Sequence, residues 1–154
     1  MIFSRTEKPQ SKVLFVDMPR NSFEKIEIVS VFPQAKQVED LIIEQAEKLG
    51  YSEEDIFALR LSLEEALTNA IRHGNGQDPQ KKVKIRYRAQ PEEVEIYIAD
   101  EGKGFDPSLV PDPTREDKLE CPSGRGIMLM RAYMDLLEYN VRGNEVHLVK
   151  QRLS

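Results

Sequence analysis

The sequence predicts an α+β fold, a two-layer sandwich in which a mixed or antiparallel sheet carries its helices on one face. Strand-like segments occur as neighbouring pairs, and the strongest helical segments are grouped together. The expected order is strand, two helices, two strands, an irregular stretch, a helix and two strands, which is typical of this fold class. The length of 154 residues fits one domain with a core of its own.

The first half of the chain is expected to supply one strand and two helices. Residues 25–31 alternate charged and apolar side chains, which predicts a strand. Pro33 suits the first turn of a helix, and Gly50 suits its end. Ser52 is a plausible N-cap for the next helix, in which apolar residues recur every three or four positions to about residue 72.

Two antiparallel hairpins are expected in the second half. Residues 82–88 and 94–99 form the first, and residues 137–141 and 145–151 form the second. A helix is expected between the hairpins, from Ile127 to about residue 136. These elements place the folded domain at residues 25–152.

Two segments fall outside this pattern. Residues 1–24 are weakly patterned and read as an N-terminal extension, in which the apolar run at 12–18 is compatible with an extra edge strand. Residues 106–122 hold four of the nine prolines and few large apolar side chains. Because irregular stretches of this length are uncommon inside compact domains, the segment is predicted to be a lid or a disordered segment.

Composition excludes several classes of function. A net charge of −5 argues against sequence-independent binding of nucleic acid. The basic residues of 81–88 alternate with apolar ones and are interpreted as the solvated face of a strand. With one cysteine, no disulfide can form within a single chain, and no apolar run is long enough to span a membrane. We therefore expect a cytoplasmic protein.

The first candidate site residues follow the strand at 94–99. The apolar residues at even positions share one face of that strand, and Asp100 continues the parity, which aims a carboxylate toward the core. Gly102, Gly104 and Phe105 come next, and two glycines allow a backbone to approach a flat ligand closely. A turn that only reverses the chain is the alternative.

The second candidate motif lies on the long helix. Glu65 and Asn69 are four residues apart and share a face, expected to lie away from the apolar stripe. An acid and an amide oxygen there could hold hydrated Mg²⁺ or orient a nucleophile, and a solvated polar face is the alternative. His73 follows four residues later. With two histidines in the chain, a zinc site is not expected.

The third motif introduces the helix of the second half. Gly124 and Gly126 flank Arg125, directly after Ser123 and before Ile127. Backbone N–H groups at a helix N-terminus, freed by glycines, can bind an anion. The motif lacks the lysine and the spacing of a P-loop.

In order and spacing, these three motifs resemble the Bergerat-fold ATPases, a group that includes gyrase-type topoisomerases and histidine-kinase catalytic domains. The resemblance covers roughly residues 25–152. The positions that match the family's asparagine box and its two glycine boxes are Glu65 and Asn69, Asp100, Gly102 and Gly104, and Gly124 and Gly126. Within the group, the fuller strings around residues 65–74 and 124–135 resemble the bacterial anti-sigma-factor serine/threonine kinases.

The resemblance implies a function. A protein of this kind binds ATP and Mg²⁺, phosphorylates a small antagonist protein and binds a sigma factor, as a homodimer. Asn69 is expected to ligate Mg²⁺, Asp100 to accept the adenine amino hydrogen, and Glu65 to be the general base, while residues 106–122 close as a lid. The remaining nucleotide-binding residues are expected to be His73, Gly102, Gly104, Phe105, Ser123, Gly124, Arg125, Gly126 and Ile127.

Two other functions stay open. A nucleotide-dependent binding module would use ATP only to set the conformation of the lid, with little or no catalysis. A detached histidine-kinase catalytic domain would share the same pocket, although no phosphoacceptor helix pair precedes residue 25 in this sequence.

Overall fold

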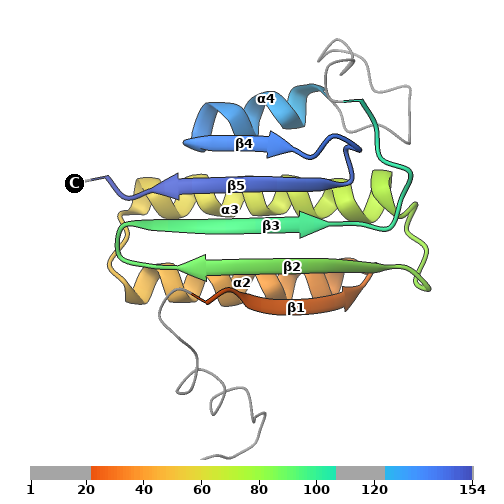
Figure 1. Ribbon diagram of the computed structural model, residues 1–154. Helices are drawn as coiled ribbons and strands as arrows, with labels where there is room; N and C mark the ends of the chain where they lie inside the picture. Colours follow the sequence, from red (N-terminus) through yellow and green to blue (C-terminus); the bar gives the residue numbers. More distant parts are fainter. Residues whose placement is uncertain (1–21, 107–123, 154) are drawn as a thin grey trace, which may run out of the picture.

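The computed structural model describes residues 22–106 and 124–153 (Figure 1). The extra strand predicted at 12–18 and residues 107–122 of the predicted lid lie outside these ranges. The described elements follow one another in the predicted order, from a first strand to a closing hairpin.

Five strands form one sheet, in the order β1-β2-β3-β5-β4. Every neighbouring pair is antiparallel, which confirms the predicted α+β class and resolves its sheet as antiparallel rather than mixed. The hairpin β4–β5 inserts β5 beside β3, so that the last strand is central. The strands span Glu24–Val29 (β1), Lys82–Ala89 (β2), Glu93–Ala99 (β3), Leu136–Tyr139 (β4) and Glu145–Gln151 (β5).

Three α-helices pack on one face of this sheet (Figure 1), as predicted. They are α2 (Phe32–Lys48), α3 (Glu53–Thr68) and α4 (Gly124–Tyr133), and α3 continues into a π-helical turn, η1 (Asn69–Gly74). Ser52 caps α3 as expected, because its hydroxyl accepts a hydrogen bond from the Asp55 N–H at 3.1 Å.

Alternation along the strands separates a core face from a solvated face. Val94, Ile96 and Ile98 of β3 are at most 2% exposed and pack under the helices. On the opposite face, Arg86 lies 3.6 Å from a carboxylate oxygen of Glu145. The basic residues of β2 therefore form a solvated, ion-paired face, as the alternation predicted.

Two helix boundaries differ from the expectation. Helix α4 starts at Gly124 and ends at Tyr133, about three residues early at each end. It ends there because the chain already runs along β5, where the Asp135 N–H donates to the Val149 carbonyl at 2.9 Å. The helix expected to reach residue 72 as a regular α-helix instead widens into η1, and the Asn75 N–H donates to the Ala70 carbonyl five residues back.

Within residues 22–106 and 124–153, no helix combines the length and the apolar character that crossing a membrane requires. The helices instead carry one apolar face each. Ile42 of α2 and Leu63 of α3 are fully buried, whereas Lys36 and Glu64 on the same helices face solvent.

Candidate functional site

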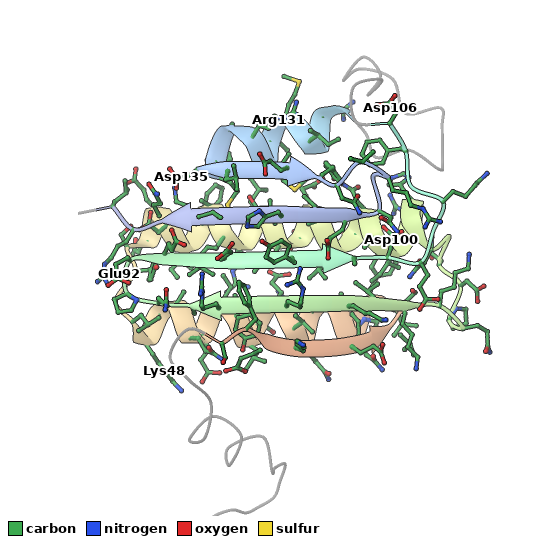
Figure 2. All side chains as sticks on the ribbon, in the orientation of Figure 1. Lys48, Glu92, Asp100, Asp106, Arg131 and Asp135 are labelled. Atoms are coloured by element: carbon green, nitrogen blue, oxygen red, sulfur yellow. The ribbon has the colours of Figure 1, made fainter. Side chains whose placement is uncertain are left out.

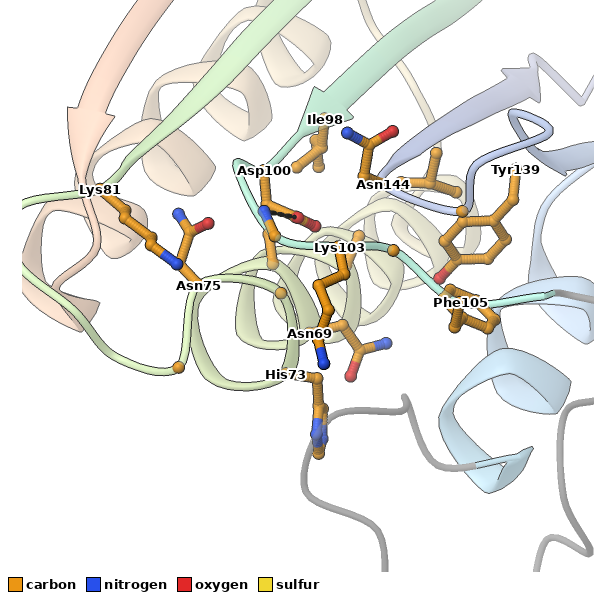
Figure 3. Close-up of a pocket in the computed structure, with 18 residues that line it drawn as sticks. Asn69, His73, Asn75, Lys81, Ile98, Asp100, Lys103, Phe105, Tyr139 and Asn144 are labelled. Carbon is orange, nitrogen blue, oxygen red and sulfur yellow. Dashed lines mark hydrogen bonds between the residues drawn. The ribbon is translucent and has the colours of Figure 1, made fainter.

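A cavity of about 210 Å³ opens at the end of the sheet where β3 stops (Figure 3). Four segments converge on it: the end of α3 with η1, the loop before β2, the loop after β3, and the β4–β5 hairpin. Six predicted site residues line it together, although up to 36 positions separate them in the sequence: Asn69, His73, Asp100, Gly102, Gly104 and Phe105.

Asp100 directly follows β3 and lines the cavity with Ile98, as its parity predicted. Its N–H donates to the Asn144 carbonyl at 2.9 Å, and its Oδ1 accepts a hydrogen bond from the Gly102 N–H at 2.8 Å. Burial raises the pKa of this carboxyl to about 6, against the lowering effects of the Gly102 N–H and of Lys81 and Arg142. Such a carboxylate is costly to keep charged and gains from a further hydrogen-bond donor.

The glycines of the site let backbone segments pack against one another. A Cβ on Gly102 would overlap the carbonyl oxygen of Gly74, and a Cβ on Gly74 would overlap the Asp100 carboxyl group. Gly104 has a φ of +82°, and a Cβ there would overlap the Arg142 carbonyl oxygen. The loop after β3 is thus held between η1 and the β4–β5 turn, which keeps its backbone against the cavity.

Asn75 anchors this arrangement and is not among the residues predicted from sequence. It is 2% exposed, and its Nδ2 donates to the Ser30 hydroxyl at 2.7 Å and to the Lys82 carbonyl at 2.9 Å. Its Oδ1 accepts a hydrogen bond from the Glu101 N–H at 2.7 Å. One side chain therefore joins η1, the start of β2 and the loop that follows Asp100.

The Asn69 end of the helix motif lies on the cavity side rather than on a separate polar face. Ala66 and Ala70 of the apolar stripe line the same cavity as Asn69 and His73, so the prediction that the motif lies away from that stripe is wrong. The π-turn, which begins at Asn69, changes the angle at which successive side chains leave the helix.

Glu65 lies beside this wall without lining the cavity. Burial and the neighbouring Glu64 raise the pKa of its carboxyl, and His73 opposes the rise. A carboxylate of raised pKa is a better proton acceptor than an exposed one, which suits a general base.

An aromatic pair closes one side of the cavity. The rings of Phe105 and Tyr139 pack edge to face, with centroids 4.9 Å apart. Burial raises the pKa of Tyr139 to about 12, so its hydroxyl stays neutral. Sequence reasoning missed Tyr139 and Asn144, because they reach the cavity only through the pairing of β5 with β3.

The third motif forms the first turn of α4, which begins at the end of the sheet where β3 stops (Figure 1). Gly124, Arg125 and Gly126 are not among the residues that line the described cavity. Ile127 is 1% exposed and packs in the core, where it anchors the helix. Ser123 lies outside the described residues.

The chemistry of the cavity wall fits a nucleotide with its metal. The Asn69 Nδ2 atom is buried and completes no hydrogen bond of good geometry within the described ranges, although its side chain lies close enough to the Tyr139 hydroxyl to lower that group's pKa. It can therefore donate to an anionic oxygen. Lys81 and Lys103 add positive charge to the lining. Residues 22–106 and 124–153 contain no cluster of three or more His, Cys, Asp or Glu side chains suited to a metal. Mg²⁺ is commonly held by few protein ligands together with substrate phosphate oxygens.

Comparison with known proteins agrees with this chemistry. The family model described as "Histidine kinase-like ATPase domain" matches residues 33–150. Serine-protein kinase RsbW of Bacillus licheniformis is 34% identical over 98 residues, which is 58% of this chain and 60% of that protein. The Anti-sigma F factor of Oceanobacillus iheyensis is 34% identical over 104 residues, which is 64% of this chain and 70% of that protein.

The fold has a counterpart among solved structures. The RsbU and RsbW domains of Rv1364c from Mycobacterium tuberculosis align with 84% of this chain and 32% of their own, at a TM-score of 0.56 and 14% identity. The chain therefore shares its fold with that protein. It spans about 60% of the length of the serine-protein kinase that it matches.

Proposed function

The chain belongs to the family of histidine kinase-like ATPase domains, and from this premise we propose that it is an ATP-dependent serine/threonine protein kinase of the anti-sigma type. Its substrate would be a serine or threonine of a small antagonist protein, and it would bind a sigma factor, acting in the cytoplasm as a homodimer. Relatives named as a serine-protein kinase and as an anti-sigma factor support both halves of the proposal.

One observation carries the enzymatic half. A single cavity joins Asn69, whose Nδ2 completes no hydrogen bond of good geometry in the described residues, to Asp100, whose pKa is raised, and Glu65 lies one helical turn before Asn69. A base, a donor for phosphate and a recognition group for the nucleobase are the parts that phosphoryl transfer needs, because positioning and charge neutralisation supply most of its catalysis.

The roles follow from the chemistry of each group. The Asp100 carboxylate accepts the adenine amino N–H, and the glycine-bearing loop after β3 lies along the base. The Asn69 side chain and the Lys103 ammonium group face the phosphates. The Asn69 carbonyl oxygen would help to hold Mg²⁺, which would supply positive charge against the phosphates when bound. Glu65 takes the proton from the attacking hydroxyl group, and the backbone N–H groups of Gly124–Gly126 face the phosphates.

Replacing Glu65 with glutamine separates the kinase from a nucleotide-dependent binding module. Glutamine keeps the size of the side chain but cannot accept the proton, so phosphotransfer to the antagonist should fall by about 10²–10⁴-fold. The affinity for ATP should stay within about twofold, because Glu65 does not line the cavity. Transfer of ³²P from ATP and calorimetric ATP binding measure the two quantities.

The matched control is Glu47→Gln, an exposed acid on α2 that is absent from the cavity lining. It should leave both quantities unchanged. Undiminished transfer by the Glu65→Gln variant would exclude Glu65 as the base. If wild type binds ATP but transfers no phosphate to any candidate antagonist, the chain is a binding module.

The raised pKa of Asp100 predicts the direction in which folding stability changes with pH. The folded state holds this proton up to about pH 6, whereas the ordinary value is 3.8, so between these values the folded state binds more protons. Stability from this group is therefore present at low pH and is lost as pH rises through about 6. The affinity for adenosine should change in the opposite sense, because the adenine amino group needs the carboxylate.

Urea unfolding and adenosine binding from about pH 4 to about pH 7 test this expectation against an Asp100→Asn variant. The difference in unfolding free energy between the two proteins isolates Asp100 from other carboxylates. Identical pH profiles for the two proteins would contradict the role of Asp100.

A further inference from the structure

A second cavity, of about 380 Å³, lies at the far end of the domain from Asp100. Figure 2 shows Asp135, which directly follows the turn after α4, at the end of the sheet opposite Asp100. The cavity is lined by the first turns of α3, the last turn of α4, β5 and the residues after β5, namely Glu53, Glu54, Asp55, Phe57, Ala58, Ala132, Tyr133, Lys150 and Leu153. None of these residues lines the nucleotide cavity.

Two aromatic rings form an exposed wall of this cavity. Phe57 is 56% exposed and Tyr133 is 39% exposed, and their rings meet edge to face with centroids 5.5 Å apart. Phe57 lies outside the buried core cluster of the described residues. An exposed aromatic pair beside a cavity offers two ring faces to a ligand, at the cost of leaving apolar surface in water.

The floor of the cavity contains a carboxylate that is incompletely satisfied. Asp55 is 0% exposed, and its Oδ2 accepts a hydrogen bond from the Leu153 N–H at 3.1 Å. Its Oδ1 has no hydrogen-bond partner in the described part of the chain. The Asp55 Oδ1 lies 3.9 Å from the Lys150 Nζ, which makes an ion pair but is beyond hydrogen-bond distance. The Lys150 ammonium group donates instead to the Tyr133 carbonyl at 3.2 Å.

The lining is negative overall. Glu53, Glu54 and Asp55 supply three carboxylates, and Lys150 is the single cationic side chain that faces them in the lining. The first turn of a helix favours acids, which accounts for the exposed Glu53 and Glu54. Asp55 belongs to the same first turn, but it is buried, and its Oδ1 accepts no hydrogen bond in the described part of the chain.

We propose that this cavity is a docking site for an arginine side chain of a partner protein. A guanidinium group is planar, so it can stack on the Phe57 and Tyr133 rings while its edge donates to the carboxylates. Its positive charge complements the negative lining, which includes the buried Asp55, and it brings donors for the exposed Glu54 at the rim. A carboxylate or phosphate group would be repelled by the same lining.

Titration of the ¹⁵N-labelled full chain with the peptide acetyl-Leu-Arg-Leu-amide tests the proposal. The matched control peptide carries citrulline in place of arginine, which keeps the shape and removes the charge. The arginine peptide should shift the amides of residues 53–58, 132–133 and 150–153, and it should bind at least about fivefold more tightly than the citrulline peptide.

Variants of exposed residues locate the contact without disturbing the core. Phe57→Ala and Glu54→Lys should each weaken binding of the arginine peptide by about threefold or more. Glu138→Lys, which makes the same charge change at an exposed site on β4, should leave it unchanged. Unfolding curves that match wild type show that each variant folds.

Three outcomes would overturn the proposal. They are equal binding of the two peptides, shifts that do not map to this cavity, and undiminished binding by both Phe57→Ala and Glu54→Lys. Sedimentation of the chain without peptide adds a fourth. If Phe57→Ala abolishes a self-association seen in wild type, the cavity is filled by a second copy rather than by a partner. Neither the peptide titration nor the sedimentation experiment requires ATP. Their outcomes are therefore independent of the proposed kinase activity.

Discussion

Replacing Asn75 with alanine is expected to lower the free energy of unfolding by about 3 kcal/mol, because the deletion leaves buried polar groups without partners. The Lys82 carbonyl and the Glu101 N–H lose the bonds that Asn75 makes to them at 2.9 and 2.7 Å. Urea or thermal unfolding measures the effect, which corresponds to a fall in Tm of roughly 6–12 °C for a domain of this size.

The same substitution should weaken nucleotide binding, since Asn75 holds the loop that follows Asp100. The variant Asn75→Asp separates the contribution of the side-chain donor from that of the side-chain acceptor. It keeps an acceptor for the Glu101 N–H but turns the donor that faces Ser30 and Lys82 into an acceptor. Gln80→Ala removes an exposed amide from the loop between Asn75 and β2, and it should change the free energy of unfolding by less than about 0.5 kcal/mol. A loss below about 1 kcal/mol for Asn75→Ala would show that water replaces its bonds.

Replacing Asn69 with alanine is expected to weaken ATP binding in the presence of Mg²⁺ by on the order of 100-fold, the loss of about 3 kcal/mol of charged hydrogen bonding and metal ligation. The strengthening of ATP binding by Mg²⁺ should disappear in the variant. Calorimetry with ATP, with and without Mg²⁺, measures both effects.

The free energy of unfolding should respond to Asn69→Ala in the opposite way from its response to Asn75→Ala. The Asn69 Nδ2 atom is buried without a hydrogen bond within the described residues, so alanine removes an unsatisfied donor and should leave the free energy of unfolding equal or higher. Asn144→Ala is the matched control, because it removes an amide from the same cavity at the β4–β5 turn. If Asn144→Ala costs as much affinity as Asn69→Ala, or if Mg²⁺ still strengthens binding in the latter, Asn69 is not the metal ligand.

Local pattern accounts for much of the fold and for part of the candidate site. The period of two along 94–99 placed Asp100 on the inner side, where it lies in the structure beside Ile98. Helical periodicity and Ser52 located α3 to within a residue at its start. These signals are local, since each depends on the geometry of one strand or one helix turn, and a single sequence displays them directly.

The missed features depend on contacts between segments. The π-turn at the end of α3 accompanies the anchoring of Asn75 against Ser30, which lies 45 positions earlier. Nothing in the local sequence distinguishes Asn75 from a residue that merely follows a helix. The face assigned to Asn69 was wrong because the cavity takes in both Asn69 and the apolar-stripe residues Ala66 and Ala70.

The sequence by itself determined the order of the elements, the α+β class and the motif residues, because hydrophobic period, caps and glycine placement act over a few neighbouring positions. Only the tertiary structure decided that β5 lies beside β3 and brings Tyr139 and Asn144 to Asp100. It also decided that the Asn69 Nδ2 atom lies buried without completing a hydrogen bond in the described residues, and that Asp55 lines the same cavity as Phe57 and Tyr133. Burial and hydrogen-bond satisfaction depend on which distant segments pack together, and strand pairing sets that packing.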